Sequence, residues 1–158
     1  MLKWVSNKEI RDNLGLTNDP DLEKTQTWIA RLSESKNILA MAIEVDNVYV
    51  GNVVLDQMDK KVRSARLSIY IGDSSARGRG VGSHSISHAL KTAFQSLELN
   101  KVWLTVHCKN SQAINAYIKC GFLIEGVRRQ EFALANRLVD CFHMGILAGE
   151  WCEESNSP

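Results

Sequence analysis

The stretch Ala76-Arg77-Gly78-Arg79-Gly80-Val81-Gly82-Ser83 decides the fold of this chain of 158 residues. The run 65–71 before it alternates between apolar and polar residues, which is typical of a β-strand. Behind it, apolar residues recur at the spacing of an amphipathic helix: Ile86, Ala89, Leu90, Ala93, Phe94 and Leu97. A strand, a glycine-rich turn and a helix in this order direct several backbone N–H groups to one point, which favours a phosphate group. The sequence therefore predicts a pyrophosphate cradle.

The predicted phosphate-binding residues are Arg77, Gly78, Arg79, Gly80, Val81, Gly82 and Ser83. The glycines have no Cβ, so a ligand can approach the main chain, and the arginines add donors suited to phosphate. A Walker P-loop would have a lysine directly before Ser83, and this chain has none there. A dinucleotide-binding fingerprint would have glycine or alanine in place of Ser83, so neither motif fits. A turn that binds nothing is the alternative that these residues alone leave open.

Two further segments extend the pattern. The spacing Arg77-x-x-Gly80-x-Gly82 resembles the acyl-CoA signature of the GNAT superfamily of N-acetyltransferases. Segment 102–122 is similar to the second signature of that family: a strand, an asparagine at 110, a short helix with Tyr117, and a Gly-Phe pair. Segment 140–151 resembles the last strand of the branch that acetylates ribosomal-protein termini, polyamines and nucleotide-linked amino sugars. The resemblance covers residues 37–151.

This resemblance implies an α/β (α+β) fold, with a mixed, mostly antiparallel central sheet that is splayed at the CoA site and helices on both faces. The predicted elements are a helix after Asp19-Pro20, strands over 39–45, 48–55 and 62–71, the cradle helix, a strand over 102–107, a helix over 111–119 and strands near 122–134 and 138–147. The turns of two hairpins contain Asp46-Asn47 and Asn136.

We expect a single domain over residues 1–152 and a disordered tail over 153–158. Members of this branch begin with a strand, whereas residues 4–14 already have the pattern of the first helix. Either the first strand is missing, or Met1 is a late start.

Composition limits the partners of the chain. The net charge of +1 argues against a nucleic acid or an acidic membrane as partner. The longest apolar run, 38–43, is too short to cross a bilayer, and we expect a cytoplasmic protein, monomeric or homodimeric. We expect no metal, because the four cysteines lack ligand spacing and His84 and His88 flank Ser85, where a metalloprotease has glutamate.

The resemblance implies acetyl-CoA as cosubstrate. The strand before the cradle would splay from its neighbour, and the pantetheine arm would lie in the gap and pair with the backbone of Ile69, Tyr70 and Ile71. Asn110 matches the family position that contacts this arm. It can also be the N-cap of helix 111–119, and one residue can serve both roles.

Tyr117 is the predicted general acid. A phenol can donate a hydrogen bond or a proton to the leaving thiolate, the reference pKa values being about 10 for the phenol and about 8.5 for a thiol. The alternative is a packed aromatic residue, since Tyr117 shares a helical stripe with Ala113 and Ala116.

The sequence offers several candidates for the general base. Many relatives carry a glutamate where this chain has Arg66, and a guanidinium cannot accept a proton. His107 is the predicted base, since the reference pKa of histidine is about 6.5; the alternative is a structural imidazole. Glu131 and Asp140 are further candidates, although Asp140 is better suited to fixing the hairpin around Asn136. A water relay is the remaining alternative.

We interpret the chain as an N-acetyltransferase that transfers acetyl directly to the primary amine of a small acceptor. Cys108 as an acyl carrier is the second mechanism, and a CoA-binding sensor without catalysis is the second function. Segment 2–11 resembles the start of enzymes that acetylate nucleotide-linked amino sugars, which favours that acceptor. Polyamines and protein N-termini are the alternatives.

Overall fold

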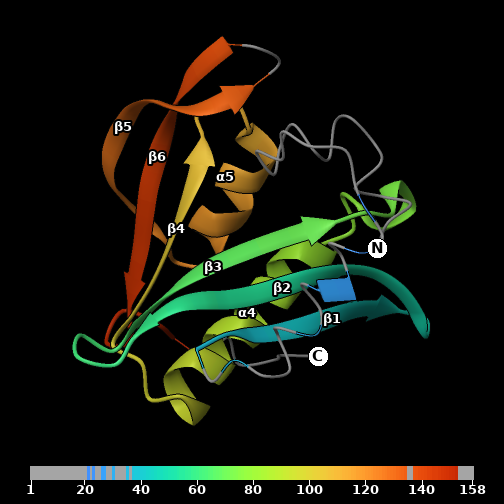
Figure 1. The fold of residues 1–158 in the computed structure, drawn as a ribbon, viewed down its shortest axis with the longest axis horizontal. Coiled ribbons are helices and arrows are strands. Elements are labelled where there is room, and N and C mark those ends of the chain that lie inside the picture. The colour runs from blue at the N-terminus through green and yellow to red at the C-terminus, as the bar shows by residue number, and fades with distance from the viewer. Residues whose placement is uncertain are drawn as a thin grey trace.

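The computed structural model describes residues 37–134 and 137–152, together with the isolated residues 21, 23, 26, 27, 30 and 35. Within this part, a six-stranded sheet has the order β1-β2-β3-β4-β6-β5 (Figure 1). Its strands are β1 (Leu39–Val45), β2 (Val48–Asp59), β3 (Ser64–Ile71), β4 (Lys101–His107), β5 (Leu123–Leu134) and β6 (Arg137–Leu147). The helical elements are η1 (Ser74–Ala76), α4 (Val81–Lys91), η2 (Thr92–Ser96) and α5 (Ser111–Lys119).

Several expectations lie outside the described residues. They concern the N-terminal strand, the helix over 4–14, the turn residue Asn136, the tail over 153–158 and most of the helix after Asp19-Pro20, of which residues 23, 26, 27 and 30 are described and helical. The remaining predicted strands and helices are confirmed, with shifts of a few residues at their ends.

The sheet is mixed and mostly antiparallel, as predicted. β3 and β4 form its parallel pair, and their pairing stops after three residue pairs, the last of which is Arg66↔Trp103. Beyond this point the two strands diverge and leave a V-shaped gap between their C-terminal halves (Figure 1). The predicted splay is therefore confirmed.

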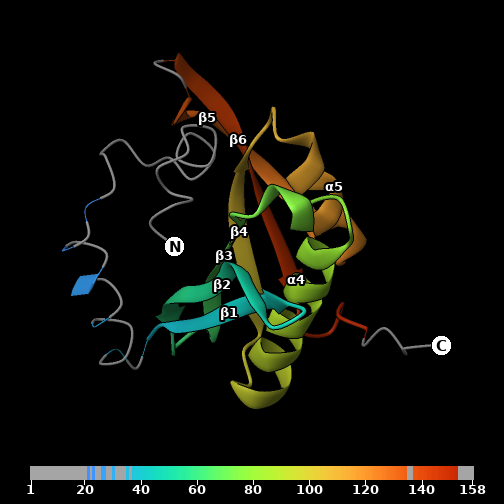
Figure 2. The same ribbon diagram turned by 90° about the vertical axis from the view of Figure 1, so that its right-hand side faces the viewer.

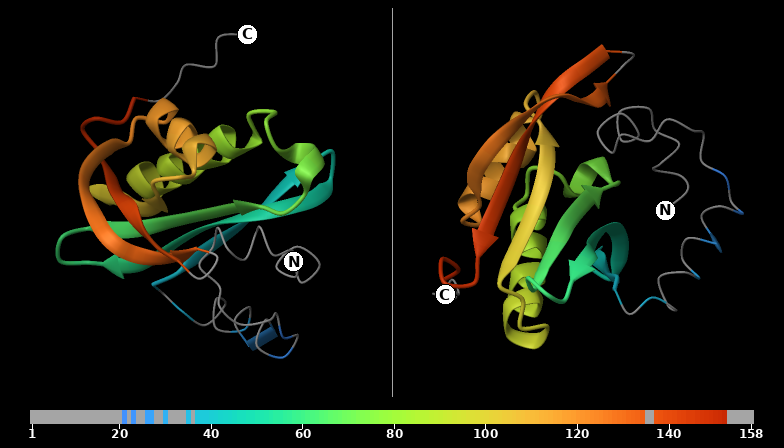
Figure 3. Two further views of the ribbon diagram at one scale, coloured as in Figure 1. Left: turned by 90° about the horizontal axis from the view of Figure 1, so that it is seen from above. Right: turned by 60° about the vertical axis from the view of Figure 1, so that its left-hand side comes forward.

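The helices α4 and α5 cover the same side of the sheet, which we call the helix face (Figures 2 and 3). The alternation along the strands explains this, since every second side chain points to the helices. The buried residues of this layer include Val53, Leu55, Ala65, Leu67, Val102, Leu104, Met144 and Ile146 from the sheet and Ile86, Ala89 and Leu90 from α4. The side chains between them point to the other side, which we call the opposite face.

The end of the cradle helix differs from the expectation. A π-helical turn, η2, continues α4, and the N–H of Leu97 donates to the carbonyl of Thr92. Because a π turn contains more residues than an α turn, it shifts the following side chains around the axis. Leu97, which we expected on the buried stripe, is consequently 38% exposed.

Local sequence explains the first hairpin. Asp46 and Asn47 have φ of 53° and 62° between the paired residues Val45 and Val48. Positive φ at both central residues is the requirement of a type I′ hairpin turn, which aspartate and asparagine tolerate.

Candidate active site

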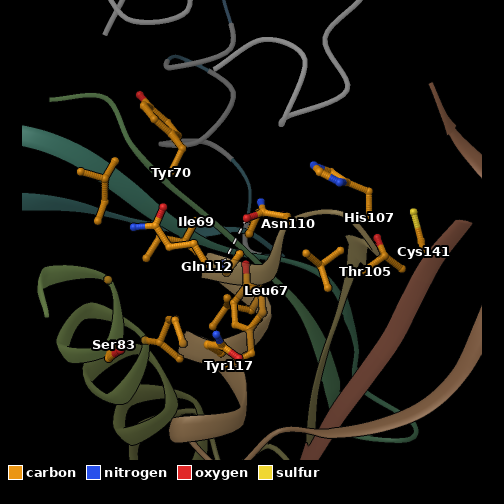
Figure 4. Close-up of a pocket in the computed structure, with 18 of the residues that line it drawn as sticks. Leu67, Ile69, Tyr70, Ser83, Thr105, His107, Asn110, Gln112, Tyr117 and Cys141 are labelled. Carbon is orange, nitrogen blue, oxygen red and sulfur yellow. Dashed lines mark hydrogen bonds between the residues drawn. The ribbon is translucent and has the colours of Figure 1, made fainter. Parts of the chain in front are cut away.

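A cavity of about 940 Å³ occupies the gap between β3 and β4. On the helix face its lining comes from the start of α4 and from α5, including Ser83 and Tyr117. On the opposite face it includes Tyr70, His107 and Cys141. Figure 4 shows Ser83 and Tyr117 toward one end of this space and Tyr70 and His107 toward the other. The cavity therefore connects the two faces of the sheet through the gap.

The glycine-rich turn forms a concave set of N–H groups at the helix-face end. Gly78 and Gly80 have φ of 73° and 81°, in the left-handed region that favours glycine, and Gly80 is the N-cap of α4. Alternation of left-handed residues with helical backbone gathers N–H groups into an anion-binding nest. Arg77 is held in place because its Nε donates to the carbonyl of Ile71 over 3.1 Å.

The structure brings most of the predicted cradle residues to the cavity. Its lining includes Arg77, Gly78, Gly80, Gly82 and Ser83. Arg79 lies exposed beside the cavity, and Val81 packs against the core. Neither of these two side chains contributes to the lining.

The edge of β3 forms one wall of the cavity through Ile69, Tyr70 and Ile71. The main-chain groups of this segment that do not face β2 face the gap, because β4 has already diverged. On the other side, Gly51 of β2 approaches so closely that an added Cβ would lie 2.2 Å from the carbonyl oxygen of Tyr70. A glycine is therefore required at position 51 to keep the wall in place.

The hydroxyl group of Tyr70 belongs to a cluster on the opposite face. Asn52 Nδ2 donates to the hydroxyl groups of Tyr49 and Tyr70 over 2.7 and 2.9 Å. Burial, followed by the hydrogen bond with Tyr49, raises the pKa of Tyr70 above its ordinary value, so its phenol stays protonated.

Tyr117 lies in the last turns of α5 and is 7% exposed. Gly121, with φ of 91°, ends this helix, and the N–H of Phe122 then donates to the carbonyl of Tyr117 over 3.1 Å. The rings of Tyr117 and Phe122 meet edge to face with centroids 5.8 Å apart. Burial, with a smaller effect of Cys120, raises the pKa of Tyr117 to about 12. Its hydroxyl group is therefore a hydrogen-bond donor at neutral pH.

Asn110 is the N-cap of α5. Its Oδ1 accepts a hydrogen bond from the N–H of Ala113 over 3.1 Å, which Figure 4 marks with a dashed line. The residue also lines the cavity. The capping role is confirmed, and its position also suits contact with a ligand in the gap.

His107 ends β4 on the opposite face and is 5% exposed. Its ring lies 5.2 Å from the ring of Phe132. Burial, followed by the charge of Lys109, lowers the pKa of His107 below its ordinary value. A lowered pKa leaves the imidazole neutral at neutral pH, which is the form that can accept a proton.

The acidic candidates are engaged elsewhere. Glu131 lines the cavity and forms an ion pair with Nε of Arg128 at 2.5 Å. Asp140 accepts a hydrogen bond from the N–H of Gln130 over 2.9 Å, across the hairpin of β5 and β6. The expectation that Asp140 fixes this hairpin is confirmed.

Arg66 stands at the base of the gap on the opposite face. Its Nε and Nη2 donate to the two carboxylate oxygens of Asp56 over 2.8 and 2.7 Å. These hydrogen bonds, which Arg66 donates to Asp56, raise the pKa of its guanidinium. Arg66 is therefore a cation at the position where the family resemblance led us to expect a carboxylate.

Sequence reasoning missed several residues of the cavity. They are Thr105, Gln112, Asn115, Lys119, Arg128, Phe132 and Cys141. Thr105 follows from the alternation along β4, which places it on the same face as His107. Cys141 and Arg128 depend on the register of β6 and β5, which no single-sequence pattern fixes. Cys108 does not line the cavity, so the acyl-carrier mechanism gains no support from its position.

No group of three or more histidine, cysteine or acidic side chains in the described part of the chain is placed to hold a metal ion. Within the same residues, none of the helices is long and apolar enough to span a membrane.

Known proteins resemble the chain in sequence and in fold. The sequence model of the acetyltransferase (GNAT) domain matches residues 1–123, and the chain belongs to this family. Two curated relatives are a spermidine N(1)-acetyltransferase of Vibrio cholerae serotype O1 and the L-amino acid N-acetyltransferase AaaT of Escherichia coli strain K12. The first is 33% identical over 67% of this chain and 61% of its own length. The second is 32% identical over 74% of this chain and 73% of its own length.

The fold agrees with this assignment. The crystal structure of spermidine N-acetyltransferase from Vibrio cholerae, in complex with CoA and spermine, superposes with a TM-score of 0.88. The two chains are 24% identical, and the match covers 94% of this chain and 88% of the other.

Proposed function

We propose that this chain transfers the acetyl group of acetyl-CoA directly to the primary amine of a small acceptor. The observation that carries the proposal is the cavity that joins the two faces of the sheet through the gap between β3 and β4. A phosphate-binding turn lies at one end, and a neutral imidazole lies at the other. Two substrates can therefore enter from opposite faces and meet in the gap.

The residues of the helix-face end fit CoA. The N–H groups of residues 78–82 and the guanidinium of Arg77 suit its pyrophosphate. The free edge of β3 over Ile69–Ile71 suits the amide groups of its pantetheine arm, and Asn110 lies at the end of β4 across the gap. Bound there, acetyl-CoA supplies a thioester carbonyl that an amine can attack.

Side chains of this protein are proposed to transfer two protons during the reaction. A C–N bond forms as the C–S bond breaks, the amine loses one proton, and the departing sulfur gains one. His107, neutral on the opposite face, is the proposed acceptor for the amine proton. The hydroxyl group of Tyr117, on the helix face, is the proposed donor to the sulfur.

The first prediction concerns the cradle. Gly82 lacks the positive φ of Gly78 and Gly80, and its added Cβ would lie 3.5 Å from Cδ1 of Ile71, an ordinary contact. A Gly82→Val variant therefore keeps the helix but fills the cofactor end of the cavity. We expect the Kd for CoA, measured by calorimetry, to rise at least about tenfold, or about 1.4 kcal/mol.

A matched control is Gly149→Val, in the turn after β6, where an added Cβ meets no atom within 4 Å. Its Kd for CoA should equal that of the original chain. An unchanged Kd in a folded Gly82→Val protein would reject the cradle as the CoA site.

The acceptor is proposed as a small primary amine. The two curated relatives are named for spermidine and for L-amino acids, which are both small amines. A nucleotide-linked amino sugar, favoured by segment 2–11, belongs to the same broad class and stays a proposal.

Release of CoA thiol from acetyl-CoA in the presence of a panel of amines tests the proposed function. Thiol release with at least one amine, accompanied by the acetylated amine in a mass spectrum, is the expected result. Binding of CoA without turnover of any amine would instead support the alternative of a CoA-binding sensor. That alternative is considered because Arg66 stands where a carboxylate was expected.

A further inference from the structure

The charges on the acceptor side of the cavity are unequal. Of the described residues that line it on the opposite face, Arg66 and Arg128 carry guanidinium groups and Glu131 carries a carboxylate. The residues that face a substrate arriving there therefore include more cationic than anionic side chains.

The carboxylates of Asp56 and Glu131 are already paired with these arginines. Asp56 accepts from Nε and Nη2 of Arg66, and Glu131 pairs with Nε of Arg128. A guanidinium has more N–H donors than these contacts use, and its planar fork matches a carboxylate or a phosphate. A second anion can therefore be bound by the N–H groups that these contacts leave over.

The register places Arg128 close to the proposed base. Cys141 pairs with His107 on one side and with Arg128 on the other, so the three residues form a row across β4, β6 and β5. Neighbouring strands lie about 4.8 Å apart, which puts the backbone of Arg128 about 10 Å from that of His107. The side chains of Arg128 and His107 both line the cavity.

The thiol between them responds to both charged groups. Burial and then Cys108 raise the pKa of Cys141, Glu131 and Asp140 raise it further, and Arg128 lowers it. Arg128 and Glu131 thus act electrostatically on the position directly beside His107. The register of β5 shifts between Arg128 and Phe132, and Glu131, which lies within this irregular segment, forms its ion pair with Arg128.

We propose that the acceptor is a small amine that also carries a carboxylate or a phosphate group, and that Arg128 binds this anion while the amine lies beside His107. The inference rests on the proposed acetyl transfer and narrows its acceptor. Amino acids and phosphate-bearing amines, including nucleotide-linked amino sugars, belong to this class. Polyamines, which carry no anion, do not.

Rates of thiol release on paired amines test the inference. L-Amino acids are compared with their C-terminal amides, and O-phosphoethanolamine is compared with ethanolamine, with spermidine as the polycation. We expect kcat/KM for the anionic member of at least one pair to exceed that of its neutral partner at least tenfold. The pair that shows the preference identifies the anion as carboxylate or phosphate.

Variants of adjacent arginines then assign the residue. Arg128→Gln should abolish the preference by raising KM for the anionic amine about tenfold, with little effect on the neutral partner. Arg129→Gln is the matched control, because Arg129 is exposed and does not line the cavity, and it should keep the preference.

Three results would overturn the inference. Faster turnover of spermidine or of the neutral amines by the original chain would exclude an anionic acceptor while the acetyl transfer itself stands. An equal loss on both members of a pair in Arg128→Gln would remove Arg128 as the anion-binding residue. Absence of thiol release with every amine would overturn the proposed function, and this inference with it.

Discussion

A Tyr117→Phe variant is expected to turn over about 100-fold more slowly than the original chain, with an almost unchanged Kd for acetyl-CoA. The loss arises because the phenol hydroxyl is the proposed donor to the departing sulfur. With a pKa raised to about 12, Tyr117 is a much weaker acid than a thiol, so it stabilises the sulfur mainly through a hydrogen bond. Removal of one such donor costs about 100-fold to 1,000-fold in kcat in well-studied enzymes.

Phenylalanine keeps the ring that packs against Phe122, so the variant should fold normally. Tyr49→Phe is a useful control, since Tyr49 does not line the cavity. Steady-state rates of thiol release at saturating acetyl-CoA give the comparison. Equal kcat in Tyr117→Phe and the original chain would leave Tyr117 with a packing role alone.

The second large effect concerns His107. We expect kcat/KM to rise with pH through an apparent pKa below the ordinary value of about 6.5, because burial and Lys109 disfavour the imidazolium. A lowered pKa means that the imidazole loses its proton at a lower pH, so the rising limb moves to the acid side. Phe132 packs against the ring, and Cys141 is paired with His107 across the sheet, with a thiol whose pKa is raised by burial.

A His107→Gln variant should lose this limb and about 100-fold in kcat/KM at neutral pH. Glutamine retains a polar group of similar reach at the end of β4, which limits the change in packing. If a water relay removes the amine proton instead, the profile of the variant follows the pKa of the substrate amine, as in the original chain. An unchanged pH profile would therefore reject His107 and retain the relay.

Local sequence patterns predicted most of the fold. The alternation along β3, the glycines before α4 and the Gly-Phe pair after α5 are each tied to a local backbone requirement, such as the positive φ of Gly121. The divergence of β3 from β4 followed from the family resemblance alone, because no local pattern reports where two strands separate. The π turn at η2 was also missed, since its sequence has ordinary helical periodicity.

The acceptor side was harder to predict because it depends on strand register. The sequence identified Arg66 as a departure from the family pattern. Its ion-pair partner Asp56 could be identified only from the register of β2 and β3, in which the two residues are directly paired. Arg128 and Cys141 join His107 in one row through two further pairings and a bulge in β5. Long-range register of this kind depends on packing across the whole sheet.

A crystal structure of the chain grown with CoA tests the central claim most directly. The account predicts that the pyrophosphate contacts the N–H groups of residues 78–82 and that the pantetheine arm lies in the gap beside Ile69–Ile71. The terminal sulfur should then lie within hydrogen-bonding distance of the Tyr117 hydroxyl group. Electron density for CoA at any other place, with the gap between β3 and β4 filled by side chains or solvent, would contradict the account.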